Sequence, residues 1–236
     1  MWPVIHDFGI IRFLGFEFHL AIYSYGFMLV VAFYTCYALL LKEMRRLGYG
    51  DKLASDILTA AAIGGIIGSK IYYLLENYDR VVVDPIGMIF SGAGLVFLGG
   101  LMGGTLGVTI VLKKNELHWL TFADIVAPLL ILGYAIGRVG CFLVGDDYGL
   151  PTRFLIGMTF ENGSPPTTYG SLTYNYPWVD LSGWDSGEVI TVYPTQIMET
   201  IIGLGIFYFL WKKRETIKVK GSLFFTYLIF AGIERF

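Results

Sequence analysis

The segment 137–152 holds the residues of this chain whose types and spacing are best suited to chemistry. Arg138 ends an apolar stretch, and two carboxylates, Asp146 and Asp147, follow it shortly. A charged side chain at membrane depth is costly, so it usually has a function there. A guanidinium is always charged and donates paired hydrogen bonds to phosphate oxygens. The pattern predicts a site for an anionic lipid headgroup, and the alternative is an ion pair of Arg138 with Asp146 or Asp124 that only fixes the helix end.

Three other polar residues in or beside the apolar stretches are candidates for a site. Arg235 ends the last apolar stretch and should arrive at the same depth as Arg138, so that two guanidinium groups converge on one phosphate. Glu199 follows Gln196 on the same helix face and is either a catalytic carboxylate or a satisfied structural pair. Tyr25 is expected in the outer half of the first apolar stretch, where tyrosine hydroxyls are common anchors.

Glycines recur at helical spacing in the second and third apolar stretches, over 64–68 and 99–107. Small residues four positions apart let two helix backbones approach closely, so these runs predict tight packing of the two helices. Lys70 follows the first run inside its apolar stretch. A lysine there must snorkel, pair or line a wet cavity. The residue is an interfacial anchor or a cavity residue, and both readings stay open.

The composition excludes several classes of protein. Of 236 residues, 55% are hydrophobic and only 15% are charged, which is outside the range of soluble globular domains. The two cysteines, Cys36 and Cys141, stand in or beside apolar stretches, so they predict free thiols rather than a disulfide framework or a zinc site. The chain has no nucleotide-binding loop and no basic stripe for nucleic acid. We therefore expect no metal, no cofactor and no nucleic-acid partner.

Length and charge predict how the chain crosses a membrane. A bilayer core of about 30 Å needs roughly 20 apolar residues of helix. Six segments come close: 19–41, 56–76, 94–112, 120–140, 193–211 and 221–236. We therefore expect an all-α polytopic membrane protein with a transmembrane helix bundle, in which 1–236 is a single membrane domain.

Lysine and arginine gather in the connections after the first, third and fifth of these segments. By the positive-inside rule these connections are cytoplasmic, and the amino terminus is outside. The stretch 145–191 then lies outside as well, as a small head of turns and short strands rich in Gly, Pro, Ser, Thr, Tyr and Trp. Because the last segment reaches Phe236 without a flanking loop, we also expect a seventh span beyond it.

The run 137–152 resembles the signature of the prolipoprotein diacylglyceryl transferases, GRxGNFxNGExxGxPT. Other stretches of the chain resemble further blocks of that family in the same order, so the resemblance covers essentially the whole sequence. These stretches are Tyr25-Gly26, 68–73, 97–101, Asp124 with Pro128, 193–196 with Glu199, and 232–236.

The resemblance implies an enzyme of the bacterial cytoplasmic (inner) membrane. It would move the diacylglyceryl group of phosphatidylglycerol onto the lipobox cysteine thiol of a prolipoprotein signal peptide, forming a thioether and releasing glycerol phosphate. By the same resemblance the catalytic residues are Arg138, Arg235, Tyr25, Asp146 and Glu199. The substrate-binding residues would be Lys70, Gly99, Gly100, Asp124, Cys141 and Gly149. The family's seven-span topology, with an outer head between spans 4 and 5, agrees with the orientation inferred from charge.

The chain departs from the family pattern where chemistry is expected. Leu98 stands where the family has a histidine, Cys141 and Val144 replace two asparagines, and Asp146 replaces a glutamate. Lys70 and Ala231 replace an arginine and a tyrosine. Since leucine cannot accept a proton, a transferase would need another base, for instance Asp146 or Asp147.

Two functional hypotheses follow from this comparison. The first is a diacylglyceryl transferase with its base elsewhere. The second is a catalytically silent or altered-specificity relative that binds anionic phospholipid. A transporter of an anionic solute is disfavoured, because the two halves of the chain do not pair as inverted repeats.

Overall fold

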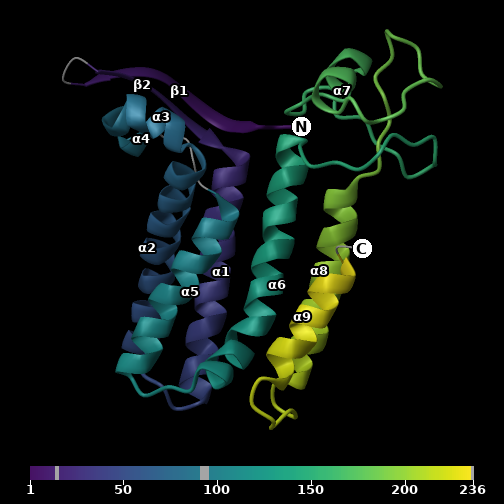
Figure 1. The fold of residues 1–236 in the computed structure, drawn as a ribbon. Coiled ribbons are helices and arrows are strands. Elements are labelled where there is room, and N and C mark those ends of the chain that lie inside the picture. Colours follow the sequence, from purple (N-terminus) through teal and green to yellow (C-terminus); the bar gives the residue numbers. More distant parts are fainter. Residues whose placement is uncertain (14–15, 91–95, 235–236) are drawn as a thin grey trace. The chain divides into compact units, whose positions relative to one another are not determined.

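The computed structural model describes residues 1–13, 16–90 and 96–234 and is mostly helical in that part (Figure 1). The amino-terminal elements are β1 (Val4–Phe13), β2 (Phe16–Tyr23), α1 (Ser24–Arg46), α2 (Asp51–Glu76), α3 (Tyr78–Val83) and α4 (Pro85–Phe90). The remaining elements are α5 (Phe97–Lys114), α6 (Trp119–Val144), α7 (Tyr169–Asn175), α8 (Thr195–Lys213) and α9 (Ser222–Glu234). The chain divides into two compact units, the first with residues 1–36, 127–218 and 223 onward, the second with 37–126 and 219–222.

In the second unit, α2 and α5 lie side by side with their backbones in close contact (Figure 1). A Cβ atom added to Gly68 would come within 2.8 Å of Gly103 Cα, and one added to Gly107 within 2.5 Å of Ala60 O. Ser69 Oγ also donates to Val96 O at 2.9 Å. This glycine seam between α2 and α5 confirms the packing expected from the glycine spacing.

In the first unit, α6 packs against α8 and α9 through a cluster of buried side chains. Its centre is Ile131 of α6, Leu210 of α8 and Leu223 of α9. The first half of α1 packs on the other end of α6, since a Cβ on Gly140 would come within 3.2 Å of the Tyr25 ring. These contacts join the amino-terminal end of α1, α6, the end of α8 and the start of α9 within one unit.

The segment 145–191 has a small core of its own. Phe160, Leu172, Leu181 and Ile190 are buried together with Val192, which directly follows the segment. Isolated antiparallel bridges, such as 151 to 192 and 168 to 189, replace the short strands expected from the sequence. The short helix α7 was not expected; the Thr168 hydroxyl caps it by accepting from Ser171 N.

Four helices of the described chain are long and apolar enough to cross a membrane: α1, α2, α5 and α6. The chain is a multi-pass membrane protein. The two other expected spans, 193–211 and 221–236, correspond to α8 and to the shorter apolar α9. Neither is among these four helices, so the count of six spans stays a prediction.

The expectation of an all-α chain is wrong at the amino terminus, where β1 and β2 form an antiparallel hairpin. The first helix consequently starts at Ser24 rather than at 19. The hairpin's register shifts between Asp7 and Ile10, where Gly9 takes a positive φ of 75°. Such an irregularity needs the left-handed backbone that glycine adopts without strain.

Candidate functional site

Arg138 is the centre of a charged cluster in the first unit. It lies in the last third of α6 and is only 8% exposed. Its Nη1 donates to Asp147 Oδ2 at 2.7 Å and its Nη2 to Asp147 O at 3.1 Å. Its Nε forms an ion pair with Glu199 Oε2 of α8, without the alignment of a hydrogen bond. Both partners differ from those considered from the sequence, Asp146 and Asp124.

The loop after α6 is tied to the start of α8 by polar contacts. Thr195 Oγ1 donates to Asp147 O at 2.9 Å, and Gln196 Nε2 donates to Asp146 O at 2.6 Å. Gly149 N donates to Tyr193 O at 2.8 Å. These contacts fix the loop carbonyls, so the side chain of Asp147 is held where it meets Arg138.

Asp146 and Gln196 each present a buried acceptor oxygen. Asp146 Oδ1 and Gln196 Oε1 have no hydrogen-bond donor among the described residues. Burial raises the pKa of Asp146 above its ordinary 3.8, opposed by a hydrogen bond from the Cys141 thiol. A carboxylate with a raised pKa is a stronger base than an ordinary aspartate, so Asp146 is suited to accept a proton.

Tyr134 joins two glutamates from different helices to the cluster. Its hydroxyl lies 2.6 Å from Glu199 Oε2 and 2.9 Å from Glu234 Oε1 of α9. Glu199 therefore contacts both Tyr134 and Arg138. The charged cluster extends from the loop at Asp147 to the end of α9.

Tyr25 is the remaining predicted residue that the structure brings to this cluster. It lies in the first turn of α1, and the residue is 42% exposed. Its hydroxyl is within electrostatic reach of Cys141, Asp146 and Arg138. The structure thus brings together Tyr25, Arg138, Cys141, Asp146 and Glu199, with Gly149 in the adjoining loop.

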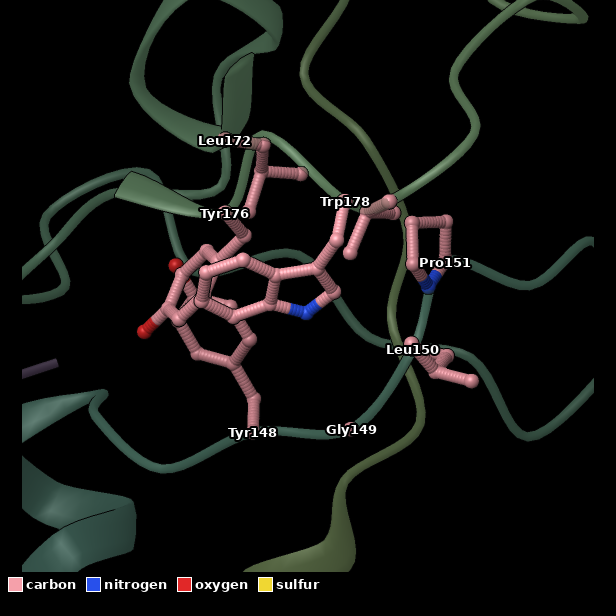
Figure 2. A pocket seen from close by; sticks show the side chains of 8 residues that line it. Tyr148, Gly149, Leu150, Pro151, Leu172, Tyr176 and Trp178 are labelled. Carbon is pink, nitrogen blue, oxygen red and sulfur yellow. The ribbon is translucent and has the colours of Figure 1, made fainter. Parts of the chain in front are cut away.

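A pocket of about 290 Å³ begins directly after Asp147. Figure 2 shows the side chains of Tyr148, Tyr176 and Trp178 at the pocket's wall, where the Tyr176 ring meets the other two rings edge to face. The remaining lining residues are Gly149, Leu150, Pro151, Leu172 and Val179. Burial raises the pKa of Tyr148, whose hydroxyl donates to Pro165 O at 3.0 Å. The lining carries no charged side chain, so the pocket is not a phosphate site, and the charge suited to phosphate is on Arg138.

Four predicted residues lie in the second unit and make contacts there. Gly99 and Gly100 belong to the glycine seam, where a Cβ on Gly100 would come within 2.7 Å of Ser69 Oγ. The Lys70 ammonium lies 5.3 Å from the centre of the Tyr73 ring. Asp124 Oδ2 accepts from Gly221 N at 2.6 Å. Their substrate-binding roles stay predictions.

Arg235, the second half of the predicted phosphate clamp, lies outside the described residues. Two described members of the cluster, Tyr134 and Glu234, were missed by reasoning from the sequence. Both had a signal there: Tyr134 stands one helical turn before Arg138, and Glu234 directly precedes Arg235. Among the described residues, no group of three or more His, Cys, Asp and Glu could hold a metal ion.

Comparison with known proteins gives a consistent picture. Residues 13–236 match the family model described as prolipoprotein diacylglyceryl transferase. The chain is 34% identical to phosphatidylglycerol--prolipoprotein diacylglyceryl transferase 2 of Clostridium perfringens, over 94% of this chain and 80% of the relative. It is 31% identical to the Clostridium tetani enzyme, covering 92% and 80%. It is 32% identical to that of Chlorobaculum tepidum, covering 92% and 73%.

Proposed function

This chain belongs to the prolipoprotein diacylglyceryl transferase family, and we propose that it transfers the diacylglyceryl group of phosphatidylglycerol to the lipobox cysteine of a prolipoprotein. The cysteine sulfur attacks the glyceryl carbon, the bond from that carbon to the phosphate oxygen breaks, and glycerol phosphate leaves. The thiol proton must be removed for the sulfur to attack as a thiolate. The reaction therefore needs a cation at the phosphate and a proton acceptor at the thiol.

Arg138 is the observation that carries this proposal. It is a nearly buried arginine at the end of an apolar helix, and its partners come from a loop and a second helix. A guanidinium in such a place can bind the lipid phosphate and stabilise the negative charge that grows on the leaving group. Arg235 would add a second cation by its place in the sequence.

Asp146 is the proton acceptor that the site supports best. Its Oδ1 is buried without a donor among the described residues, and its pKa is raised by burial. The neighbouring Cys141 thiol partly opposes that rise. Tyr25, Glu199 and the loop at Gly149 would position the two substrates around this pair.

The orientation of the chain is part of the same proposal. We place the protein in the bacterial inner membrane with its amino terminus and the segment 145–191 outside. The cationic connections support this, since α1, α5 and α8 carry lysines or arginines in their last turns. A site beside the segment 145–191 would then meet secreted preproteins at the outer surface.

A silent or altered-specificity relative that binds anionic phospholipid is the second candidate. It is favoured by one feature, the replacement of the family's histidine by Leu98, which is 46% exposed on α5 and cannot carry a proton. The two candidates share the phosphate site at Arg138 and differ only in whether a thioether forms.

The experiment that separates them is transfer by the purified full-length protein. It is incubated in nanodiscs with phosphatidylglycerol and a lipobox peptide, and the peptide's mass is followed. A mass gain of one diacylglyceryl group supports the transferase. Phosphatidylglycerol binding with no mass gain from pH 5 to 9 supports the silent relative.

The role of Arg138 is tested in the same assay. Arg138→Ala should lower kcat/KM by about 10²–10³, the loss typical of removing one oxyanion donor. Arg138→Lys should recover little of the lost kcat/KM, because a lysine ammonium cannot donate the paired hydrogen bonds that a guanidinium gives to a phosphate. Arg153→Ala is the matched control, since Arg153 lies in the segment 145–191 and stacks on Trp184 instead. Near-normal turnover of Arg138→Ala would refute the phosphate site.

A further inference from the structure

A groove of about 530 Å³ lies along α2 and α5, lined by residues within 56–64 and 107–115. This α2–α5 groove belongs to the second unit and contains no residue of the charged cluster. Its volume is in the range of small-molecule sites. Both helices are long and apolar enough to cross a membrane, so the molecules that surround the groove are those of the bilayer.

The floor of the α2–α5 groove is part of the glycine seam. Gly64 of α2 and Gly107 of α5 line it, and neither has a side chain to fill the space. Ile63 and Ile110 line the same groove and are 54% and 47% exposed. The close approach of the two backbones therefore leaves a shallow apolar channel that is open to a lipid chain.

Each helix contributes a row of side chains that changes from polar to apolar. Residues four positions apart lie on one face of a helix, so Thr59 is followed by Ile63 on α2, and Ile110 by Lys114 on α5. The helices run in opposite directions, since the seam joins the first half of each to the second half of the other. Thr59 and Lys114 are therefore at the same end. Helix side chains lean toward the amino terminus, so Lys114 leans back along the groove.

The polar end of the α2–α5 groove offers two donors. Among the described residues, neither the Lys114 ammonium nor the Thr59 hydroxyl has a hydrogen-bond or ion-pair partner. Asp56 is the other charged residue of the lining, and its Oδ2 is paired with Lys52 Nζ at 2.8 Å. An ammonium and a hydroxyl can both donate to one phosphate group. The polar end is thus suited to an anion, and the rest of the groove to hydrocarbon.

We propose that the α2–α5 groove binds one anionic phospholipid of the bilayer, with the phosphate on Lys114 and Thr59 and an acyl chain over Ile63 and Ile110. The part from Thr59 to Gly64 is about 7.5 Å long at 1.5 Å per residue, so it holds the first part of the chain. Basic pockets between transmembrane helices at the cytoplasmic side are typical sites of anionic lipids.

The lysines in the last turn of α5 place this end at the cytoplasm in the orientation proposed above. The site binds lipid without a reaction, so it does not depend on diacylglyceryl transfer and is separate from the phosphate site proposed at Arg138.

Photolabelling of the purified full-length protein tests the site. The probe is phosphatidylglycerol with a diazirine in one acyl chain, in phosphatidylcholine nanodiscs, and the labelled residues are mapped by mass spectrometry after irradiation. Label is expected within 59–64 and 107–111. Unlabelled phosphatidylglycerol should compete for it about fivefold better than added phosphatidylcholine, the preference expected from one lysine at a membrane surface.

Lys114→Gln should weaken binding of the probe about tenfold, because it removes a charge-assisted hydrogen bond. Lys113→Gln is the matched control, since Lys113 is in the same last turn of α5 but does not line the groove. Both variants are measured in 1 M salt, where the Debye length is about 3 Å and the general attraction of lysines for anionic lipid is screened. Lys113→Gln should then change binding by less than about twofold.

Two further variants test the chain and the charge separately. Ile110→Trp fills the apolar end and should remove the label although every charge is kept. Asp56→Asn should leave binding unchanged or strengthen it, because it removes a carboxylate from the lining. Weaker binding in Asp56→Asn, with better competition by phosphatidylethanolamine, would instead place a lipid ammonium on Asp56 and overturn the proposal.

Three other results would also overturn it. Equal competition by phosphatidylcholine would show that the groove meets bulk lipid only, and equal losses in Lys113→Gln and Lys114→Gln would show that no phosphate contacts Lys114. Absence of label within 59–64 and 107–111 would show that another segment or a second copy covers the groove. Arg138→Ala should keep the label, so the lipid site and the transferase can fail independently.

Discussion

Gly103 is the position where a single methyl group should separate two helices. A Cβ there would lie 2.8 Å from Gly68 Cα and 3.1 Å from Gly64 C, and closer still to the carbonyl oxygen of Gly64. Ordinary contacts of a Cβ begin at 3.4 Å. All the atoms that it meets belong to the backbone of α2, so no side chain can turn away. In Gly103→Ala the two helices must therefore move apart by about 0.6 Å or more.

The expected cost follows from two opposing effects. Overpacking of a close contact costs about 1–3 kcal/mol, and the wider separation also weakens the neighbouring contacts of the seam. Alanine is a better helix former than glycine by about 0.8–1.0 kcal/mol, which offsets part of the cost. We expect Gly103→Ala to lower the free energy of unfolding by about 1–2 kcal/mol.

The matched control is Gly205→Ala, because Gly205 lies inside α8 and a Cβ there meets nothing within 4 Å. This variant should be unchanged or more stable by up to about 1 kcal/mol. Both free energies of unfolding are measured by reversible unfolding in mixed detergent micelles with rising dodecyl sulfate. If Gly103→Ala were as stable as Gly205→Ala, the seam would not be a close backbone contact, and the argument would be refuted.

Three other changes test separate parts of the structure. Asp146→Asn should flatten the dependence of stability on pH. Because the pKa of Asp146 is raised in the folded wild type, the folded state binds the proton more tightly than the unfolded state, and stability falls as pH rises from 3.8 through the folded pKa. Thermal midpoints measured over that range should show this fall in the wild type and not in the variant. Gly149→Ala places a Cβ 2.7 Å from Thr195 Cγ2 and should lower kcat about tenfold by displacing the loop, whereas unchanged kcat would show that the loop position is not critical. Asp124→Ala removes the acceptor of Gly221 N and should lower the free energy of unfolding by about 1–3 kcal/mol; equal stability would contradict a structural role.

Helix positions could be predicted from the sequence because a membrane helix needs a long apolar stretch. The expected span 120–140 is contained in α6, and 56–76 in α2. Both helices extend beyond the apolar part, since backbone hydrogen bonding continues where side chains are polar. The hairpin was missed because its stretch was interpreted as a polar segment that precedes the first span. The signal for a strand was weak: Val4, His6 and Phe8 occupy every second position, as residues on one face of a strand do.

The candidate site was predictable where a single charged residue stands out in an apolar stretch. A lone arginine in an apolar stretch is costly, so Arg138 was found, and Glu199 was found for the same reason. Its partners were not, because the rotation of one helix against another decides them. A single sequence does not predict that Glu234 of α9 contacts Tyr134, which lies 100 positions earlier.

The same contact makes the order of synthesis matter. Arg138 and Tyr134 emerge from the ribosome well before Glu199, and Glu234 emerges last of the four. Until α8 and α9 have been synthesised, Arg138 has Asp147 but lacks Glu199, and Tyr134 lacks both glutamates. A chain without α8 would therefore hold the nearly buried Arg138 with one of its two carboxylate partners missing, which favours degradation by quality-control proteases. An interrupted chain that stops before α8 should therefore be short-lived in the cell.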